Sequence, residues 1–157
     1  MNTLTPQTVE ALLPLACAWA AEQERSILQT GVALTESQLA DARRVGVAHS
    51  ERVRLLRVDL IPTPKHPDLA EAASATGLIS PSTEGLTLRY GILIRADCWG
   101  KRPLVVHELV HTMQYERLGG FEDFLRPYLL ECIPPICYPN GGLEQEARQV
   151  AGETCIE

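Results

Sequence analysis

The 157-residue chain has no uncharged run long enough to cross a membrane. Its longest uncharged stretches, residues 11–21, 72–83 and 132–143, reach about a dozen residues, whereas a spanning helix needs about twenty. Basic residues are scarce as well, because two lysines and twelve arginines stand against twenty acidic residues, giving a formal net charge of −6. The sequence lacks the basic stripe that would displace counterions from phosphates. We therefore expect neither a membrane span nor a nucleic-acid partner.

A secretory leader is not indicated either. Residues 11–21 are apolar, but the first twenty-four residues contain no Lys or Arg. Glu10 stands where a signal peptide carries positive charge. We expect a cytoplasmic protein.

The cysteines show no spacing typical of a disulfide framework or a zinc ribbon. They are five in number, which is odd, and no two of them form a C-x-x-C pair. We expect free thiols that serve in packing: Cys17, Cys98, Cys132, Cys137 and Cys155.

The chain also lacks internal repeats, low-complexity tracts and Gly/Ser linkers. Its length is that of one ordinary domain, which buries roughly 68–70% of its unfolded surface. We expect a single domain over residues 1–157, in which 1–50 form a helical part and 51–157 hold a sheet and a metal site.

The hydrophobic pattern predicts helices first, strands next and helices again, which is typical of the α+β class. A capping box over residues 35–38 indicates where the second helix begins. The strand-like segments are expected to form one small antiparallel sheet. The expected helices are 8–30, 35–45, 68–75, 103–118, 121–132 and 143–154, and the expected β segments are 51–61 and 86–97.

The predicted helix over residues 103–118 contains an H-E-x-x-H pattern. His107 and His111 are four residues apart, so they lie on one helix face and can chelate one Zn²⁺ ion. Glu108 can reach a water molecule beside that ion, accept its proton and pass it to a leaving amine. A surface helix with an incidental histidine pair, in a metal-free scaffold, is the simpler alternative.

This motif on an amphipathic helix resembles the zincin metallopeptidases. The metzincin branch is excluded, because it requires Gly and His where this chain has Gln114 and Arg117. The gluzincin branch takes its third ligand, a glutamate, from a later helix, often in an E-x-x-A-D pattern. Residues 143–148 (LEQEAR) match that pattern at Glu144 and Ala147 and depart from it at Arg148. The resemblance implies Glu144 as the third zinc ligand.

Two other acids, Glu146 and Asp123, stay open as the third ligand. Acidic residues at 144 and 146 are also what the N-terminal end of a helix favours without any metal. The family's Asp at 148 would orient a ligand histidine, so another acid, not identified from the sequence, is needed for that role.

A zincin-like reaction needs a hydrogen-bond donor for the oxyanion in addition to the metal. Tyr138, in the connector before the Glu144 helix, is the first candidate. Tyr115 and Arg148 are the alternatives.

The resemblance covers about residues 85–152, and it implies that Gly91–Arg95 forms the upper edge of a cleft and pairs with an extended peptide. An ordinary core strand is equally compatible with this segment. The short chain leaves little room for a second lobe. We therefore expect a shallow cleft, open on one side, that suits flexible peptide segments.

These observations predict a minimal gluzincin-like zinc metallopeptidase. Zn²⁺ would be held by His107, His111 and Glu144, with Glu108 as the general base for peptide-bond hydrolysis. The alternative is a catalytically inactive zincin-like module that binds a metal or a peptide in a regulatory role.

Overall fold

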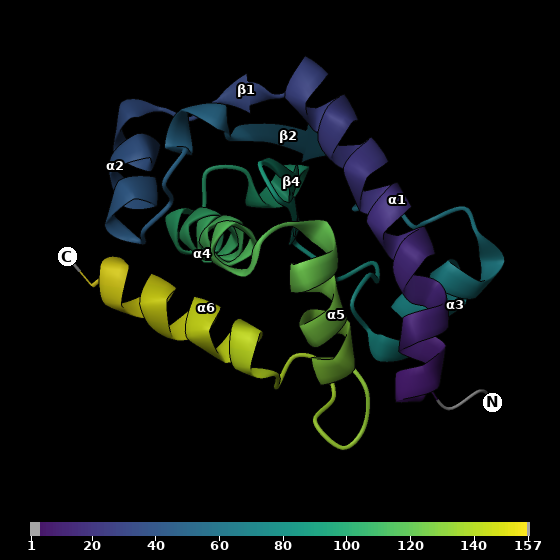
Figure 1. Cartoon of the computed structure of the whole chain (residues 1–157). Helices are drawn as coiled ribbons and strands as arrows, with labels where there is room; N and C mark the ends of the chain where they lie inside the picture. The colour runs from purple at the N-terminus through teal and green to yellow at the C-terminus, as the bar shows by residue number, and fades with distance from the viewer. Residues whose placement is uncertain (1–3, 157) are drawn as a thin grey trace.

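A computed structural model describes residues 4–156 and contains six α-helices and a four-stranded mixed sheet in that range. This content agrees with the predicted α+β class. Short 3₁₀ helices occupy Ser50–Arg52 and Ala96–Cys98. The main elements, shown in Figure 1, are α1 (Pro6–Thr30), β1 (Val32–Ala33), α2 (Glu36–Arg44), β2 (Arg54–Val58), α3 (Pro67–Thr76), β3 (Gly85–Leu88), β4 (Gly91–Arg95), α4 (Arg102–Leu118), α5 (Phe121–Glu131) and α6 (Gly142–Thr154).

Local signals fix several helix ends where the sequence predicts them. The Thr35 hydroxyl accepts a hydrogen bond from the Gln38 amide, and the Gln38 side chain accepts one from the Thr35 amide, which confirms the capping box. Helix α4 ends at Gly119, whose φ of 118° is unfavourable for residues with a side chain. Helix α5 continues through Pro127 without being split in two.

The sheet is mixed, so the prediction of an antiparallel sheet was wrong. Its strand order is β1-β2-β4-β3, and β2 runs parallel to β4. The predicted β segment 86–97 is in fact a hairpin of β3 and β4 that turns at Arg89 and Tyr90. That turn reverses the chain and places β4 beside β2 in the same direction. Strand β1 also joins the sheet, so the helical N-terminal part contributes to it.

The expectation that Gly91–Arg95 forms a cleft edge was also wrong. Strand β4 lies between β2 and β3, and four of its five residues are buried. Strands covered on both faces carry continuous apolar runs such as ILI, which explains this sequence. Within the described residues, β3 forms the edge of the sheet on this side.

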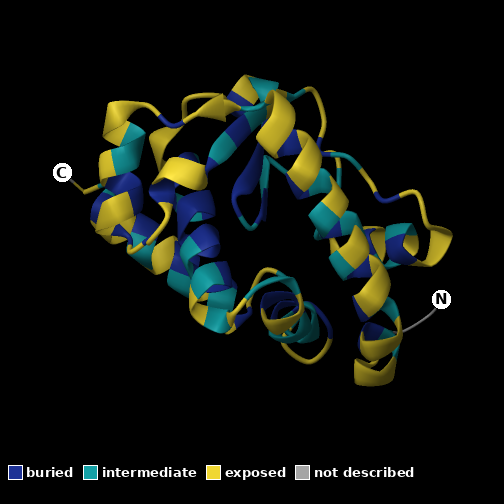
Figure 2. Cartoon of the chain, turned by 45° about the horizontal axis from the view of Figure 1, so that its top comes forward, coloured by how far each residue is buried: buried dark blue, intermediate teal, exposed yellow. Residues whose placement is uncertain are grey.

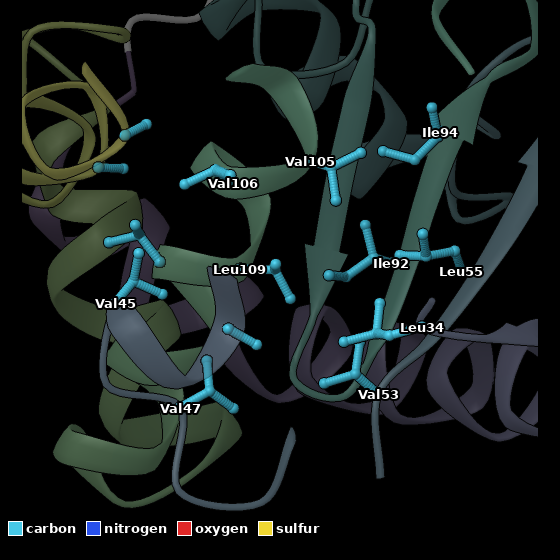
Figure 3. Close-up of a cluster of buried hydrophobic side chains, with 14 of the residues drawn as sticks. Leu34, Val45, Val47, Val53, Leu55, Ile92, Ile94, Val105, Val106 and Leu109 are labelled. Atoms are coloured by element: carbon cyan, nitrogen blue, oxygen red, sulfur yellow. The ribbon is translucent and has the colours of Figure 1, made fainter. Parts of the chain in front are cut away.

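The sheet separates two hydrophobic clusters. On one face, Ile92 and Ile94 pack against Val105 and Leu109 of α4, together with apolar residues of α2 and α6 (Figure 3). On the other face, Leu93 packs with residues of α1 and α5. The helices turn their buried residues inward and their exposed residues outward (Figure 2). Helix α4 is therefore held between the sheet and α6.

Helix α1 is tied to the β3–β4 turn by a buried carboxylate. Glu24 accepts two hydrogen bonds from the Arg89 guanidinium, at 2.8 and 2.7 Å, and one from the Tyr90 amide at 3.0 Å. Arg89 has a φ of 61°, an uncommon conformation for a residue with a side chain. The three bonds hold the turn in that conformation.

None of the helices in the described part of the chain combines the length and the apolar character needed to cross a membrane.

Candidate metal centre

Two helices bring together three side chains that could bind a metal ion. His107 and His111 extend from α4, and Glu144 comes from the first turn of α6. The Nε2 atoms of His107 and His111 lie 3.1 and 2.7 Å from the two carboxylate oxygens of Glu144. One donor atom from each residue lies within 4.8 Å of the others. Two imidazole nitrogens and one carboxylate oxygen are a donor set that fits zinc and leaves further coordination positions open.

Small residues allow α6 to approach the metal-binding helix. Ala147 and Ala151 are buried one and two turns after Glu144, in the same hydrophobic cluster as Val106 and Val110 of α4. The alanine of the E-x-x-A pattern therefore serves close packing, which brings the Glu144 carboxylate to the two histidines.

The electrostatics of the cluster favour a positive charge. Burial raises the pKa of Glu144, but hydrogen bonds from His107 and His111 outweigh burial and hold the pKa well below its usual range. Burial lowers the pKa of His111, but its hydrogen bond to Glu144 and the nearby charge of Glu108 outweigh burial and raise it. The same carboxylates that favour a proton here favour a metal cation.

The metal-free protein should therefore lose stability as the pH rises. His111 has a raised pKa, so its protonated form stabilises the fold fully below the unfolded pKa of about 6.5, and this contribution is lost as the pH passes through the folded pKa. Glu144 has a lowered pKa, so its contribution is present above about pH 4.3 and is lost only on acidification. We expect the Tm with chelator present to fall as the pH is raised above about 6.5, the unfolded pKa of histidine.

Thermal melts over a series of pH values test that expectation. Replacing His111 by Asn should flatten the fall, whereas replacing the exposed His49 by Asn should leave it unchanged. If the Tm of the His111 variant falls with pH as much as that of the wild type, the pH dependence does not come from His111.

One carboxylate oxygen of Glu108 is held by a hydrogen bond, and the other lies on the side of the cluster, where it can accept a proton. Its side chain is buried, and its Oε1 accepts a 2.8 Å hydrogen bond from the Thr87 hydroxyl on the edge strand β3. Its Oε2 lies 4.0 Å from His107 Nε2, on the side of the metal-binding cluster. Gly85 lets the strand come this close, because an added Cβ would lie 3.2 Å from Glu108 Cγ.

The residue that supports His111 is an amide, whereas the sequence led us to expect an acid. Gln114 is fully buried, and its Oε1 lies 2.7 Å from His111 Nδ1. Its amide group donates to the Leu143 carbonyl and to Glu146. Since the amide nitrogen is used in this way, its oxygen must accept from Nδ1–H, so in the neutral imidazole Nε2 carries the lone pair that faces the cluster.

Replacing Gln114 by Leu should weaken zinc binding by about 10- to 100-fold, the usual cost of losing such a supporting contact. The substitution keeps the approximate size of the side chain but frees the ring of His111 to change tautomer and orientation. Competition with a zinc-binding dye measures the affinity, and circular dichroism verifies folding. Gln149→Leu, an exposed change on α6, is the matched control and should bind zinc normally. Unchanged affinity in the Gln114 variant would contradict this role.

The alternative third ligands lie outside the cluster. Glu146 is paired with Arg117 at 2.8 Å and accepts the Gln114 hydrogen bond. Asp123 is in the first turn of α5, beside Gly119. Within the described residues, the structure brings only Glu144 to the two histidines. All five cysteines are free, as the sequence led us to expect, and none belongs to the cluster.

The tyrosines near the site have different surroundings. Tyr138 lies beside Glu108 and Glu144, where burial and these two carboxylates raise its pKa to about 12. It therefore keeps its hydroxyl proton at neutral pH. Tyr115 instead donates to the Thr87 carbonyl and stacks on Phe124.

The remaining candidate for the oxyanion donor already has a hydrogen-bond partner. In addition, one tyrosine that the sequence did not indicate contacts the cluster. The Arg148 guanidinium donates to the Pro139 carbonyl. Tyr128 donates a 2.8 Å hydrogen bond to Glu144 Oε2, a contact that its place on the apolar face of α5 does not reveal in the sequence.

The site opens on two sides. An open cleft runs between β3, the start of α4 and the connector that carries Tyr138. Behind it lies an apolar cavity, which the expectation of a shallow site did not include. His107, Glu108 and Glu144 border both spaces.

No family model matches the sequence, and no curated protein or solved structure matches the chain.

Proposed function

We propose that this protein is a zinc-dependent hydrolase of peptide bonds with a gluzincin-like arrangement. One observation carries the proposal: His107, His111 and Glu144 converge with Glu108 beside them, its second oxygen directed toward the same point. Each of the four residues is what a metal-assisted hydrolysis requires. A cytoplasmic location stays a prediction from the sequence.

The roles of the chain's own residues follow from their contacts. Zinc, when bound, supplies Lewis acidity that makes hydrolysis feasible at neutral pH. Glu108 accepts the proton of the attacking water and delivers it to the leaving amine, with Thr87 holding its other oxygen. Gln114 keeps His111 in the tautomer that can bind a metal. Tyr138 retains its proton and can donate to the carbonyl oxygen of the substrate.

The edge strand β3 is the part of the sheet that could pair with a substrate. It borders the open cleft, and an extended peptide can add to such an edge through backbone hydrogen bonds. In this respect β3 replaces β4, the strand to which the resemblance assigned this role.

Elemental analysis of the purified protein tests the metal assignment. We expect one zinc per chain in the wild type. Glu144→Ala should lose most of the zinc, because it removes one of three ligands, whereas Glu146→Ala should keep it. Full zinc in the Glu144 variant would rule out this ligand.

The inactive-module alternative was motivated by the missing acid at position 148. The structure weakens that motive, because Gln114 supports a ligand histidine from another position. Both functions require bound zinc, so they differ in turnover alone. The Glu108 variant described in the Discussion separates them.

A further inference from the structure

The cavity behind the metal centre has a volume of about 140 Å³ and is bordered by α1, α3, α5 and the edge strand β3. A cavity of about 150 Å³ with a similar apolar lining stays dry and binds benzene in another protein. Most of the lining side chains are aliphatic or aromatic, among them Val9, Leu12, Leu69, Leu88, Phe124 and Leu129.

The lining of the cavity follows α1 over several helical turns. The residues of this helix that line it include Val9, Leu12, Ala16 and Ala20, which occupy one helix face over successive turns. From Val9 to Ala20 the helix rises about 16 Å, at 1.5 Å per residue. The alanines leave room along this face. The apolar lining is therefore longer than the stretch that a compact, ring-shaped ligand would contact.

Charge is confined to one end of the cavity. Among the described residues that line it, the acidic and histidine side chains are those of the metal centre. The open cleft on the other side of the centre also carries charged side chains, those of Lys101, Arg148 and Glu84. The reacting groups thus stand between an apolar cavity and an open cleft that offers charged side chains.

We propose that the substrate is an N-acyl amide whose unbranched acyl chain fills this cavity. This inference rests on the proposed function and adds the substrate class. The amide lies at the metal centre, and the amine portion lies in the open cleft beside its charged side chains. Hydrolysis joins the water oxygen to the acyl carbon and breaks the C–N bond. Glu108 carries one proton of the water to the amine nitrogen, and the carboxylic acid that forms releases the other to the amine, so the products are a carboxylate and an ammonium ion.

Calorimetric titration with N-acylglycines of increasing chain length tests the proposal directly. The zinc-loaded Glu108→Gln variant is used, so that ligands bind without turnover. Affinity should rise about fourfold per added methylene, the usual gain from burying that group, and then become constant when the chain reaches the end of the cavity. The same titration with N-acyl tetrapeptides shows whether an acylated amino acid or an acylated peptide binds more tightly.

Two variants that fill part of the cavity, together with one control variant, test where the acyl chain of the ligand binds. Ala16→Phe, or Ala20→Leu if the first variant fails to fold, should weaken decanoylglycine binding at least tenfold and leave butanoylglycine unchanged. Ala18→Phe, on the exposed face of the same helix, should alter neither affinity. Affinity that does not depend on chain length, or decanoylglycine binding that survives both filling variants, would overturn the proposal. So would equally tight binding of the compact 3-phenylpropionylglycine.

The outcome is distinguishable from failure of the proposed function. Chain-length-dependent binding by a protein that holds no zinc and shows no turnover would preserve the cavity assignment and refute the hydrolase. Zinc binding and peptide cleavage, with an affinity that does not depend on acyl chain length, would support the hydrolase and refute the cavity assignment.

Discussion

Replacing Glu108 by Gln is expected to lower the rate of substrate hydrolysis by about 10²- to 10⁴-fold, the usual contribution of a positioned general base. The amide keeps the size of the side chain and can still accept the Thr87 hydrogen bond through its oxygen. It cannot accept a proton from water. The loss should therefore appear in kcat, measured with a peptide library or an acylated peptide.

The zinc content decides whether that loss reflects chemistry. Glu108 is not one of the three proposed metal ligands, so the variant should retain one zinc per chain. Glu153→Gln, an exposed change on α6, should keep full activity. Equal activity of the Glu108 variant and the wild type would contradict the assigned role. A wild type that binds zinc but cleaves no substrate would favour the inactive module.

Removing zinc should destabilise the protein by a large margin. At a free zinc concentration about a thousand times the Kd, binding stabilises the folded state by about 4 kcal/mol. For a chain of this length that corresponds to a fall in Tm of about 8–16 °C when a chelator is added. Differential scanning calorimetry with and without the chelator measures the change.

The ligand variants provide the control. Glu144→Ala lacks a ligand, so its Tm should respond little to the chelator, while Glu146→Ala should respond like the wild type. The two residues are on the same helix, but their carboxylates have different partners, the histidines for Glu144 and Arg117 for Glu146. A wild-type Tm that does not change with chelator would show that no tightly bound metal supports the fold.

Features determined by short stretches of sequence were predictable. Thr35 and Gln38 form their capping box within one helical turn, and Gly119 ends α4 through its own backbone conformation. The H-E-x-x-H pattern places two histidines on one face through helix geometry alone. Glu144 was predicted from the resemblance of residues 143–148 to the E-x-x-A-D pattern, and the structure shows that the alanine of this pattern, Ala147, is buried.

Features that depend on tertiary contacts were not predictable. The parallel pairing of β2 with β4 joins segments separated by more than thirty residues, and neither segment specifies its neighbour. Thr87 and Gln114 have ordinary places in a strand and a helix, and their roles arise only when Glu108 and His111 come within reach. A buried amide can replace an expected acid, because either can accept a hydrogen bond from an imidazole N–H.

The bond between Glu24 and Arg89 has a consequence for how the molecule can be divided. It anchors the turn of the hairpin whose first strand carries Thr87, the residue that orients Glu108. Residues 85–152 contain all of the proposed metal ligands, yet the carboxylate that secures their turn is contributed by α1, some sixty positions earlier in the chain. Residues 85–152 are consequently not sufficient to form the site on their own. In another scaffold they would lack Glu24, the residue that fixes the turn of the hairpin.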